Sequence, residues 1–433
     1  MGKTKYEIKG RDFYINGKPT YSEIPGSNEN VHGLLFNARF IQGVFQDINP
    51  KNQGDYNRFG KTFDPEKNTD DLIAALPDWY NYGMRAFTVG LVGGGPCMSL
   101  TDWGSLEFGT FSSDGKTMDT GVFDRLVRII DAADRLGMLV IVSYLYQGQL
   151  RYFDNDSAIE TACKTATDAI CGLDYDNIII EVANEYDIFE PKVPQTKLYE
   201  PEKMASLVEK VKTWCGGRFA VGSSTYCIKE SDRPVMQASD ICIFHGNDSR
   251  REELHARAKM IRKWCPDKPL VVNEDSAMVT QMDVAFEDHF SWGYYNNLTK
   301  QEPPTDWNIT PGEDRYFAYR MAKGIGIKVP EIDEDSIMLQ GFEPNINLSD
   351  GGRFVRVSSL HPERIDKVRF YEDGKLLDVS FDEPFYYLPT KTWSQAAYIQ
   401  SPDAKEFAAE VIKYDGTIVW LKQDLTTLIN DKR

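Results

Sequence analysis

Two glutamates stand where short apolar segments end, a position suited to acid–base chemistry. Glu185 follows the segment Asn177–Asn184, and Glu274 follows the segment Lys268–Asn273. Both segments resemble parallel strands that are covered on both faces, and the carboxyl ends of such strands meet at one face of a fold. Two carboxyl groups in different surroundings can hold different protonation states. Cleavage of a glycosidic bond needs one protonated and one ionised carboxyl group, because the leaving oxygen takes a proton while an anion stabilises or attacks the oxocarbenium-like centre.

The Asn-Glu dipeptide by itself carries little information, because it occurs three times in the chain. The copy at residues 28–29 has no strand-like segment before it and serves as an internal control. The copies that end at Glu185 and Glu274 do follow such segments, so their context makes them candidates. Asp275 is adjacent to Glu274, and the reactive carboxylate of that segment is either of the two. A structural carboxylate that pairs with an arginine is the ordinary alternative for each.

Side chains that suit sugar binding follow other expected strands. His245 comes directly after the sixth, Tyr146 follows the third, and Trp103 lies in the loop after the second. Trp292 and Tyr294 belong to the eighth. Apolar ring faces can stack on sugar rings, while amide and imidazole groups bind hydroxyls. Each residue also has an ordinary interpretation, as a hydrogen-bonded histidine at a rim or as an aromatic ring that packs in a loop.

An alternation of amphipathic helices with short apolar strands positions these residues. Phe123–Leu136 is the clearest expected helix, with apolar residues on one face and a stop at Gly137. Repeated strand–helix units predict a parallel α/β fold, and eight units favour a (β/α)8 TIM barrel over an open doubly wound sheet. The other expected helices are Asp70–Tyr82, Ala158–Leu173 and Arg315–Gly326. The expected strands are Phe40–Val44, Met84–Val89, Met138–Tyr144, Asn177–Ala183, Phe219–Ser223, Ile241–Phe244, Leu270–Asn273 and Phe290–Tyr295.

The pattern changes at both ends of the expected barrel. Residues 1–30 read as a β-hairpin segment around Asn16-Gly17 that caps the barrel, and residues 31–329 form the barrel itself. Residues 330–433 show alternating short strands with turn signals at 372–375 and 414–417. That spacing predicts a C-terminal all-β sandwich domain.

Composition narrows the class of protein further. The 433 residues carry 49 basic and 66 acidic side chains, a net charge of −17, which argues against nucleic acid and anionic membranes as partners. The longest apolar runs are too short to span a bilayer. Seven cysteines without a CxxC pair indicate free thiols. Gly93-Gly94-Gly95 leads into a loop and not into a helix, which argues against a dinucleotide site. We expect no metal and no cofactor, and the oligomeric state stays open.

With these residues in this order, the chain resembles clan A of the glycoside hydrolases, and family 5 in particular, over about residues 12–326. The resemblance implies a barrel with catalytic glutamates after strands four and seven. Glu185 would be the acid/base and Glu274 the nucleophile. Asn184 would bind a sugar 2-hydroxyl, and His245 would support the nucleophile. The resemblance also implies a sugar platform after strand eight, for which Trp292, Tyr294 and Tyr295 are the candidates.

The chain departs from the family pattern at two places. Many members carry an arginine late in strand two, where Thr88 stands here, and tyrosines follow strand three where a histidine is common. The C-terminal region resembles the immunoglobulin-like modules of secreted bacterial glycosidases. We therefore expect a secreted or periplasmic location with a leader absent from this chain, while a cytoplasmic location stays open.

The resulting hypothesis is a retaining glycoside hydrolase that cleaves β-glycosidic bonds in a polysaccharide or oligosaccharide by double displacement. Its carbohydrate substrate is the expected partner. The alternative from another class is a non-catalytic glycan-binding protein on a degenerate glycosidase barrel. A lyase or isomerase barrel would need a metal cluster, a catalytic lysine or a phosphate loop, and the sequence analysis finds no sign of these.

Overall fold

Parallel strands form the centre of the molecule. The computed structural model describes residues 2–58, 61–96, 100, 103–188, 196–247, 249–343, 352–387, 398 and 400–428. A six-stranded parallel sheet has the order β10-β9-β8-β7-β4-β13, and β11 pairs with β12 in parallel. The bounds are β4 (Asn37–Arg39), β7 (Ala86–Gly90), β8 (Leu139–Tyr146), β9 (Ile178–Asn184), β10 (Ala220–Gly222), β11 (Cys242–His245), β12 (Leu270–Glu274) and β13 (Gly293–Tyr294). A parallel α/β architecture is thereby confirmed.

The eight strands follow one another in chain order. A parallel bridge between Val271 and Ser291 links β12 to the start of β13. Between β10 and β11, the amide of Asp240 donates to the carbonyl of Val221 at 2.8 Å. An inner apolar cluster takes its members from the strands β7 to β12, from the approach to β4 and from the N-terminal hairpin. This arrangement is consistent with a barrel and brings the carboxyl ends of the strands to one side.

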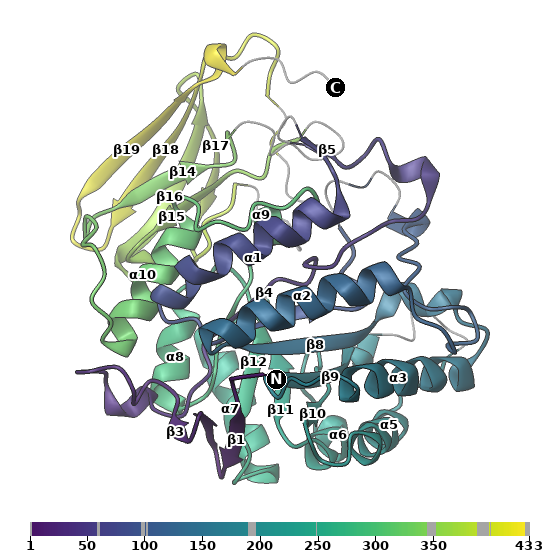
Figure 1. The fold of residues 1–433 in the computed structure, drawn as a ribbon. Helices are drawn as coiled ribbons and strands as arrows, with labels where there is room; N and C mark the ends of the chain where they lie inside the picture. Colours follow the sequence, from purple (N-terminus) through teal and green to yellow (C-terminus); the bar gives the residue numbers. More distant parts are fainter. Residues whose placement is uncertain are drawn as a thin grey trace.

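Helices cover the outside of the strands (Figure 1). The helix α2 (Thr120–Leu136) shows why the sequence folds this way locally. The Asp119 side chain accepts from the Val122 amide at its start, and Gly137 ends it with φ +84°. The remaining α-helices are α1 (Pro65–Asn81), α3 (Asp156–Cys171), α5 (Pro201–Trp214), α6 (Arg233–Ala238), α7 (Arg251–Trp264), α8 (Gln281–Asp288), α9 (Asn297–Lys300) and α10 (Glu313–Ile325).

An N-terminal antiparallel sheet lies against the amino ends of the parallel strands. Its strands are β1 (Tyr6–Lys9), β2 (Asp12–Ile15) and β3 (Lys18–Pro19), and the β2–β3 turn has positive φ at residues 16 and 17. The Tyr6 hydroxyl donates to the carbonyl of Ile178 at 2.9 Å and accepts from the amide of Ala220 at 2.7 Å. This sheet therefore covers the end of the strands that is opposite to Glu185 and Glu274. A small hairpin, β5 (Asn57–Arg58) and β6 (Lys61–Thr62), lies elsewhere in the chain.

The predicted first strand was wrong: it begins three residues and ends five residues too far along the chain. The pattern predicted Phe40–Val44, whereas the strand is Asn37–Arg39 and all three of its residues are buried. The apolar run that follows is buried, and its first two residues still bond to β7: the Phe40 amide donates to the carbonyl of Thr88 at 2.9 Å, and the carbonyl of Ile41 accepts from the amide of Gly90 at 3.1 Å. A polar residue can be buried in this strand because it is hydrogen-bonded: the side-chain amide nitrogen of Asn37 donates to the carbonyl of Val272 inside the fold. Buried polar residues broke the hydrophobic pattern on which the prediction relied.

The C-terminal region is antiparallel and has a hydrophobic core of its own. A four-stranded sheet has the order β17-β16-β18-β19, and β14 pairs with β15. Its core includes Phe342, Phe370 and Phe407. Figure 1 shows these strands, green to yellow, at one end of the molecule beyond α10. The bounds are β14 (Ile337–Gln340), β15 (Arg356–Ser359), β16 (Ile365–Glu372), β17 (Lys375–Ser380), β18 (Glu406–Lys413) and β19 (Ile418–Asp424).

Two further findings concern the chain as a whole. Among the helices that the structure describes, none is long and apolar enough to cross a membrane. Six cysteines, at positions 163, 171, 215, 227, 242 and 265, are free thiols.

A buried ion pair joins the C-terminal region to the α/β unit. Arg356 of β15 makes a bidentate contact with Glu313, the first residue of α10. The distance is 2.5 Å from Nε to Oε1 and 2.6 Å from Nη2 to Oε2. The two residues are 1% and 4% exposed. Burial opposes the charge of Arg356, but the Glu313 carboxylate outweighs it and raises the pKa of the guanidinium. The pair is therefore strongly coupled, and either member alone would be an unpaired buried charge.

We predict that Arg356→Met lowers the free energy of unfolding by about 3–5 kcal/mol, because it leaves the Glu313 carboxylate buried without its partner. Denaturant unfolding checks the value. Arg369→Met is the matched control, since Arg369 pairs with Glu410 at 3.1 Å on a more exposed surface, and this substitution should lower the free energy of unfolding much less. The double variant Arg356→Met/Glu313→Gln should recover part of the loss. If Arg356→Met and Arg369→Met lowered the free energy of unfolding equally, the Arg356–Glu313 pair would not have the special role that its burial predicts.

Candidate active site

Glu185 and Glu274 meet at the carboxyl ends of the parallel strands. Glu185 directly follows β9, and Glu274 is the last residue of β12. Both are nearly buried, with 7% and 6% exposure. One oxygen of each carboxyl group and one ring nitrogen of His245 all lie within 4.8 Å of one another. The two glutamates singled out by strand context are therefore brought together, with His245 at the same place.

The backbone at Glu185 is in a conformation that non-glycine residues rarely adopt. Its φ angle is +50°, which costs of order 1 kcal/mol for a side chain with a Cβ. Hydrogen bonds around Ser224 fix this turn: its hydroxyl accepts from the Glu185 amide at 3.0 Å, and its carbonyl accepts from the amide of Tyr186. Strained residues cluster at functional sites, so the position of this carboxyl group is consistent with a function.

Arg39 supplies a buried positive charge beside Glu274. Its Nη1 lies 2.5 Å from Oε2 of Glu274 and donates to Oδ1 of Asn184 at 2.8 Å. The amide of Asn247 donates to Oε1 of Glu274 at 2.8 Å. In the β4–β7 ladder Arg39 is paired with Thr88 of the neighbouring strand. The cation beside Glu274 thus comes from β4. Sequence reasoning missed Arg39, although a single arginine inside the apolar run 34–41 was a usable signal.

Electrostatics at Glu274 combine opposing effects. Burial raises the pKa of its carboxyl group, while the positive charge of Arg39 and the ring of His245 act in the other direction. The Asn247 hydrogen bond also favours the ionised form. Arg39 shows the reciprocal effect: burial opposes its charge, but the Glu274 carboxylate outweighs it and raises the guanidinium pKa. On balance the pKa of the Glu274 carboxyl group stays raised, with burial as the largest cause, so Arg39, His245 and Asn247 reduce the cost of the anion without cancelling it.

His245 stands between the two glutamates. Its Nδ1 is 2.9 Å from Oε1 of Glu185 and 3.6 Å from Oε2 of Glu274. Burial lowers the pKa of the imidazole, but the Glu274 and Glu185 carboxylates more than offset it and raise the pKa to about 9. The ring can therefore carry a proton at neutral pH, within hydrogen-bond distance of Glu185.

Several buried polar atoms around the two glutamates have no protein partner. They are Nδ2 of Asn184, Oε1 of Gln147 and Nε2 of His245. Gln147 also donates through its amide nitrogen to Oε2 of Glu185 at 3.2 Å. Buried polar groups are normally hydrogen-bonded. A set of donors and acceptors left open beside two carboxyl groups is what a ligand rich in hydroxyls would satisfy. Gln147 and Asn247 are further residues that sequence reasoning did not select.

Asp275, the alternative reactive carboxylate, points away from this place. It is fully buried, and its Oδ2 accepts from Nε1 of Trp292 at 2.7 Å. It also packs against Gly246, where an added Cβ would lie 2.1 Å from its Oδ2. Burial raises the pKa of the Asp275 carboxyl group to about 7, although hydrogen bonds from Trp292 and Ser276 act against the rise. The geometry therefore favours Glu274 as the reactive group.

The aromatic residues after strand eight need a correction. Trp292 and Tyr294 are fully buried, and Tyr294 stacks on Phe317 of α10 with ring centroids 4.3 Å apart. Neither presents a ring face to a sugar, because alternate residues of a strand point the same way, here toward α10. Tyr295 points otherwise: its ring lies 5.4 Å from the Arg39 guanidinium carbon. Tyr295 is 5% exposed, and its role as the sugar platform stays a prediction.

The remaining predicted residues have different outcomes. Tyr146 is the last residue of β8, is 8% exposed and lies close enough to Arg39 to affect its charge. Trp103 begins the short 3-10 helix Trp103–Ser105, but its side chain lies outside the described residues. The role of each in sugar binding stays a prediction.

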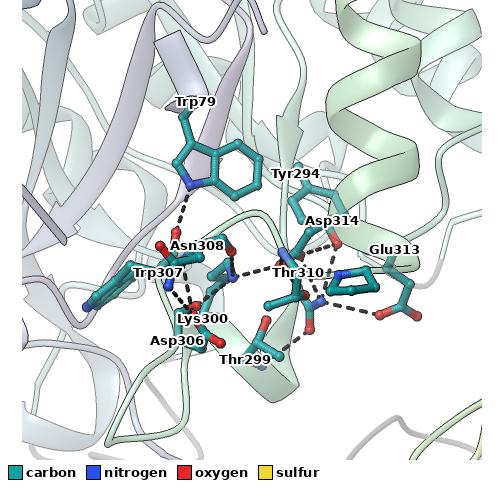
Figure 2. A network of polar contacts seen from close by, with 12 residues as sticks. Trp79, Tyr294, Thr299, Lys300, Asp306, Trp307, Asn308, Thr310, Glu313 and Asp314 are labelled. Atoms are coloured by element: carbon teal, nitrogen blue, oxygen red, sulfur yellow. Dashed lines mark hydrogen bonds and ion pairs between the residues drawn. The ribbon is translucent and has the colours of Figure 1, made fainter. Parts of the chain in front are cut away.

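A buried polar network supports the loop after strand eight (Figure 2). Lys300, 1% exposed, contacts Oδ2 of Asp314 at 2.7 Å and the carbonyls of Asp306 and Asn308 at 2.5 and 2.8 Å. The Tyr294 hydroxyl donates to the same Asp314 carboxylate at 2.8 Å. Neighbouring Gln301 donates to the carbonyl of Gly95 and bonds the Tyr295 hydroxyl. The network therefore holds the loops after strands two and eight together beside Arg39.

The group Glu185, His245 and Glu274 also has the composition of a metal site, which sequence reasoning had not found. Two observations in the described residues weigh against a cation there. Arg39 already places a positive charge 2.5 Å from Glu274. Nδ1 of His245 is engaged with Glu185, and its raised pKa favours a proton on the ring. The group is therefore better suited to holding and moving a proton.

Comparison with solved structures finds glycoside hydrolases at low sequence identity. A glycosyl hydrolase family 2 member from Bacteroides cellulosilyticus is 13% identical, with a TM-score of 0.43, over 97% of this chain and 48% of that one. An FMN-binding beta-glucuronidase from Facaelibacterium prausnitzii is 12% identical, with a TM-score of 0.46, over 99% and 60%. The beta-mannanase of the blue mussel Mytilus edulis is 10% identical, with a TM-score of 0.47, over 74% and 96%.

The chain thus spans about half to three fifths of the length of the first two structures. No protein-family model and no curated protein matches the sequence. Likenesses of this size do not decide an activity, which has to be judged from the site.

The raised pKa of Asp275 leads to a stability prediction. The folded state holds its proton up to about pH 7, whereas an unfolded aspartate releases it near pH 3.9. This group therefore stabilises the fold at low pH, and its contribution falls by up to about 4 kcal/mol as the pH rises from 4 through 7. Asp275→Asn should lack this pH-dependent contribution to stability, because an amide does not titrate. Denaturant unfolding of wild type and Asp275→Asn at pH 4.5 and at pH 8 checks the prediction. If the free energy of unfolding changes equally with pH in the two proteins, the prediction is contradicted.

Proposed function

We propose that this protein is a retaining glycoside hydrolase that cleaves β-glycosidic bonds in a polysaccharide or oligosaccharide by double displacement. Glu274 is the nucleophile and Glu185 the acid/base. The observation that carries the proposal is the approach of two buried carboxyl oxygens to within 4.8 Å, with Arg39 on one carboxylate and His245 on the other. Retaining enzymes have carboxyl groups about 5–5.5 Å apart, whereas inverting enzymes leave about 6.5–9.5 Å for a water. The nearest oxygens of the two carboxyl groups are thus close enough for a retaining pair, and we propose retention on that ground.

In the first step Glu274 attacks the anomeric carbon while Glu185 gives its proton to the leaving oxygen. Arg39 and Asn247 orient the attacking carboxylate through their contacts with its two oxygens. In the second step Glu185 takes a proton from water, and that water releases the sugar from Glu274 with net retention. Asn184, held by Arg39 through Oδ1, keeps Nδ2 for a substrate hydroxyl.

Glu185 and His245 share one exchangeable proton in this mechanism. With a proton on the imidazole the pair is ionic, and with a proton on Glu185 it is neutral. Entry of a sugar removes water and favours the neutral form, in which Glu185 can act as an acid. After transfer to the leaving oxygen, the pair lacks that proton until the second step returns it. His245 thus retains the proton for Glu185 at a pH where a lone carboxyl group would have lost it.

We propose that residues 31–329 form a closed (β/α)8 barrel, as expected for this function, and that residues 1–30 cap it. Residues 330–433 form an immunoglobulin-like β-sandwich. Tyr146 and Tyr295 are proposed to contact the sugar beside the cleaved bond, and Trp103 to contribute from the loop after strand two.

Reducing-sugar release from a panel of neutral and acidic polysaccharides tests the proposal. Wild type should cleave at least one member with retention of the anomeric configuration, seen by NMR. Glu274→Gln should lose at least about 1,000-fold in kcat because the nucleophile is gone. Glu185→Gln should lose about 100- to 10,000-fold on natural substrates and much less on aryl glycosides with good leaving groups.

Asp275→Asn is the matched control, because it changes the adjacent carboxylate that faces Trp292, and it should keep most of the activity. If wild type and Glu274→Gln bind a glycan equally but neither cleaves it, the chain is a glycan-binding protein. Inversion of configuration would also contradict the proposed mechanism.

The shared proton predicts the alkaline side of the pH–rate profile. Activity should fall with an apparent pKa near 9, the value at which His245 releases its proton in the presence of the two carboxylates. In His245→Gln the decline should begin more than about one pH unit lower, because a carboxyl group alone releases its proton earlier than an imidazolium. Profiles of kcat/KM from pH 4 to 10 check both. Superimposable profiles would show that His245 does not hold the proton.

A further inference from the structure

A layer of polar side chains lies inside the parallel strands, next to the inner apolar cluster. Successive side chains of a strand point to opposite faces, so residues two positions apart share a face. The cluster includes Leu35, Ala86, Ile179 and Val271. Two positions further along the same segments stand four fully buried polar residues, Asn37, Thr88, Glu181 and Asn273. They lie between the cluster and the carboxyl ends of the strands, and the mechanism above gives them no role.

Glu181 is the acidic member of this polar layer. Its Oε1 accepts from the side-chain amide of Asn273 at 3.1 Å, which joins β9 to β12 through the interior. Its Oε2 is buried and has no hydrogen-bond partner among the described residues. Its ladder neighbours on β8 and β10 are Ser143 and Gly222, which carry no charge. One neutral donor does not compensate a buried carboxylate, so a positive charge outside the layer has to balance it.

The positive charge that Glu181 meets belongs to His245. Burial lowers the pKa of the imidazole, whereas the carboxylates of Glu274, Glu185 and Glu181 raise it, Glu181 by the smallest amount. A buried carboxylate without a cation in its own layer and a buried imidazole that holds a proton therefore stabilise each other.

Glu181 differs from the two glutamates of the site because its charge is constant through the reaction. Glu274 becomes an ester in the glycosyl-enzyme and loses its negative charge, and Glu185 alternates between acid and base. Glu181 takes part in neither step. While Glu274 is an ester, the charge of Glu181 still favours the return of a proton to the pair of His245 and Glu185.

Other charged groups around His245 come from different elements. Arg257 of α7 donates to the His245 carbonyl at 3.0 Å, and Asp275, which directly follows β12, interacts with the charge of the imidazole. Arg39 of β4 contacts Glu274 at 2.5 Å. A substitution at Glu181 leaves these groups in place, so it changes one charge only.

We propose that Glu181 is a positioning residue that acts through His245, as a fixed negative charge below the site that keeps the proton of the His245–Glu185 pair available while Glu274 changes state. The assignment rests on the proposed hydrolase activity and deepens it. It gives a role to a charge that burial would otherwise disfavour.

NMR titration of the His245 ring tests the assignment without turnover. The chain has five histidines, and the signal of His245 is the one absent from His245→Gln. Glu181→Gln keeps an oxygen acceptor for Asn273 and removes the charge, so the midpoint should fall by about half to one pH unit. Glu181→Asp keeps the charge on a shorter side chain and should titrate close to wild type. Glu410→Gln is the matched control, because Glu410 is a carboxylate only 8% exposed in the C-terminal region, and it should not move the midpoint.

The pH–rate profile should follow the ring. In Glu181→Gln the alkaline fall of kcat/KM should move to lower pH by the same amount, while activity below that fall stays close to wild type. A merely structural role predicts a different pattern. Activity would then fall equally at every pH, and Glu181→Asp, which shortens the side chain, would be more damaging than Glu181→Gln.

Each result supports or overturns the assignment. If the wild type cleaves a glycan and Glu181→Gln titrates with the wild type, the assignment is overturned and the activity stands. If the wild type cleaves nothing and the midpoint still falls, the effect of Glu181 on His245 is supported and the hydrolase proposal fails. If Glu181→Gln does not fold, Glu181→Ser takes its place, because it also removes the charge and leaves room for water, and the same fall is required.

Discussion

The burial of several ionisable groups at the mouth of the parallel strands is the constraint on which the rest of the structure depends. Arg39, Glu185, His245 and Glu274 are each less than one tenth exposed. Charges in that setting are tolerated only where each has a partner at short range. Arg39 is the common partner, because it contacts Glu274 directly and its charge also interacts with Glu185. A shift of any one of these groups would leave a buried charge uncompensated.

A rigid frame is therefore required around the group, and the chain builds it from several sides. The N-terminal sheet covers the opposite end of the strands through Tyr6 and Phe13. The Lys300–Asp314 network fixes the loop after strand eight. Arg356 of the C-terminal region holds Glu313, whose carboxylate also accepts from Asn296 at the start of that loop. The C-terminal region is thus tied to the same support as the site and is not an independent appendage.

Sequence reasoning predicted the parts that depend on hydrophobic pattern and strand context. The helix at Phe123–Leu136 was confirmed except for three residues at its start, and the strand before Glu185 to within one residue. It failed where a buried polar residue interrupts the pattern, as at Arg39, which displaced the first strand. It also could not tell which residues of strand eight face outward. The burial of Trp292 and Tyr294 against α10, and the inward position of Tyr295, follow from strand orientation, which sequence leaves open.

The three carboxyl groups of this region show how packing assigns chemistry to residues of similar type. Glu274 and Asp275 are consecutive, so they point to opposite sides of the chain. Glu274 meets Arg39 and Asn247, which favour an anion, whereas Asp275 meets Trp292 and Gly246, where burial favours the proton. Glu185 lies beside His245, with its Oε1 2.9 Å from Nδ1 of the ring. The three carboxyl groups thus differ in their partners, and the difference among them lies in the neighbours that the fold supplies and not in the side chains themselves.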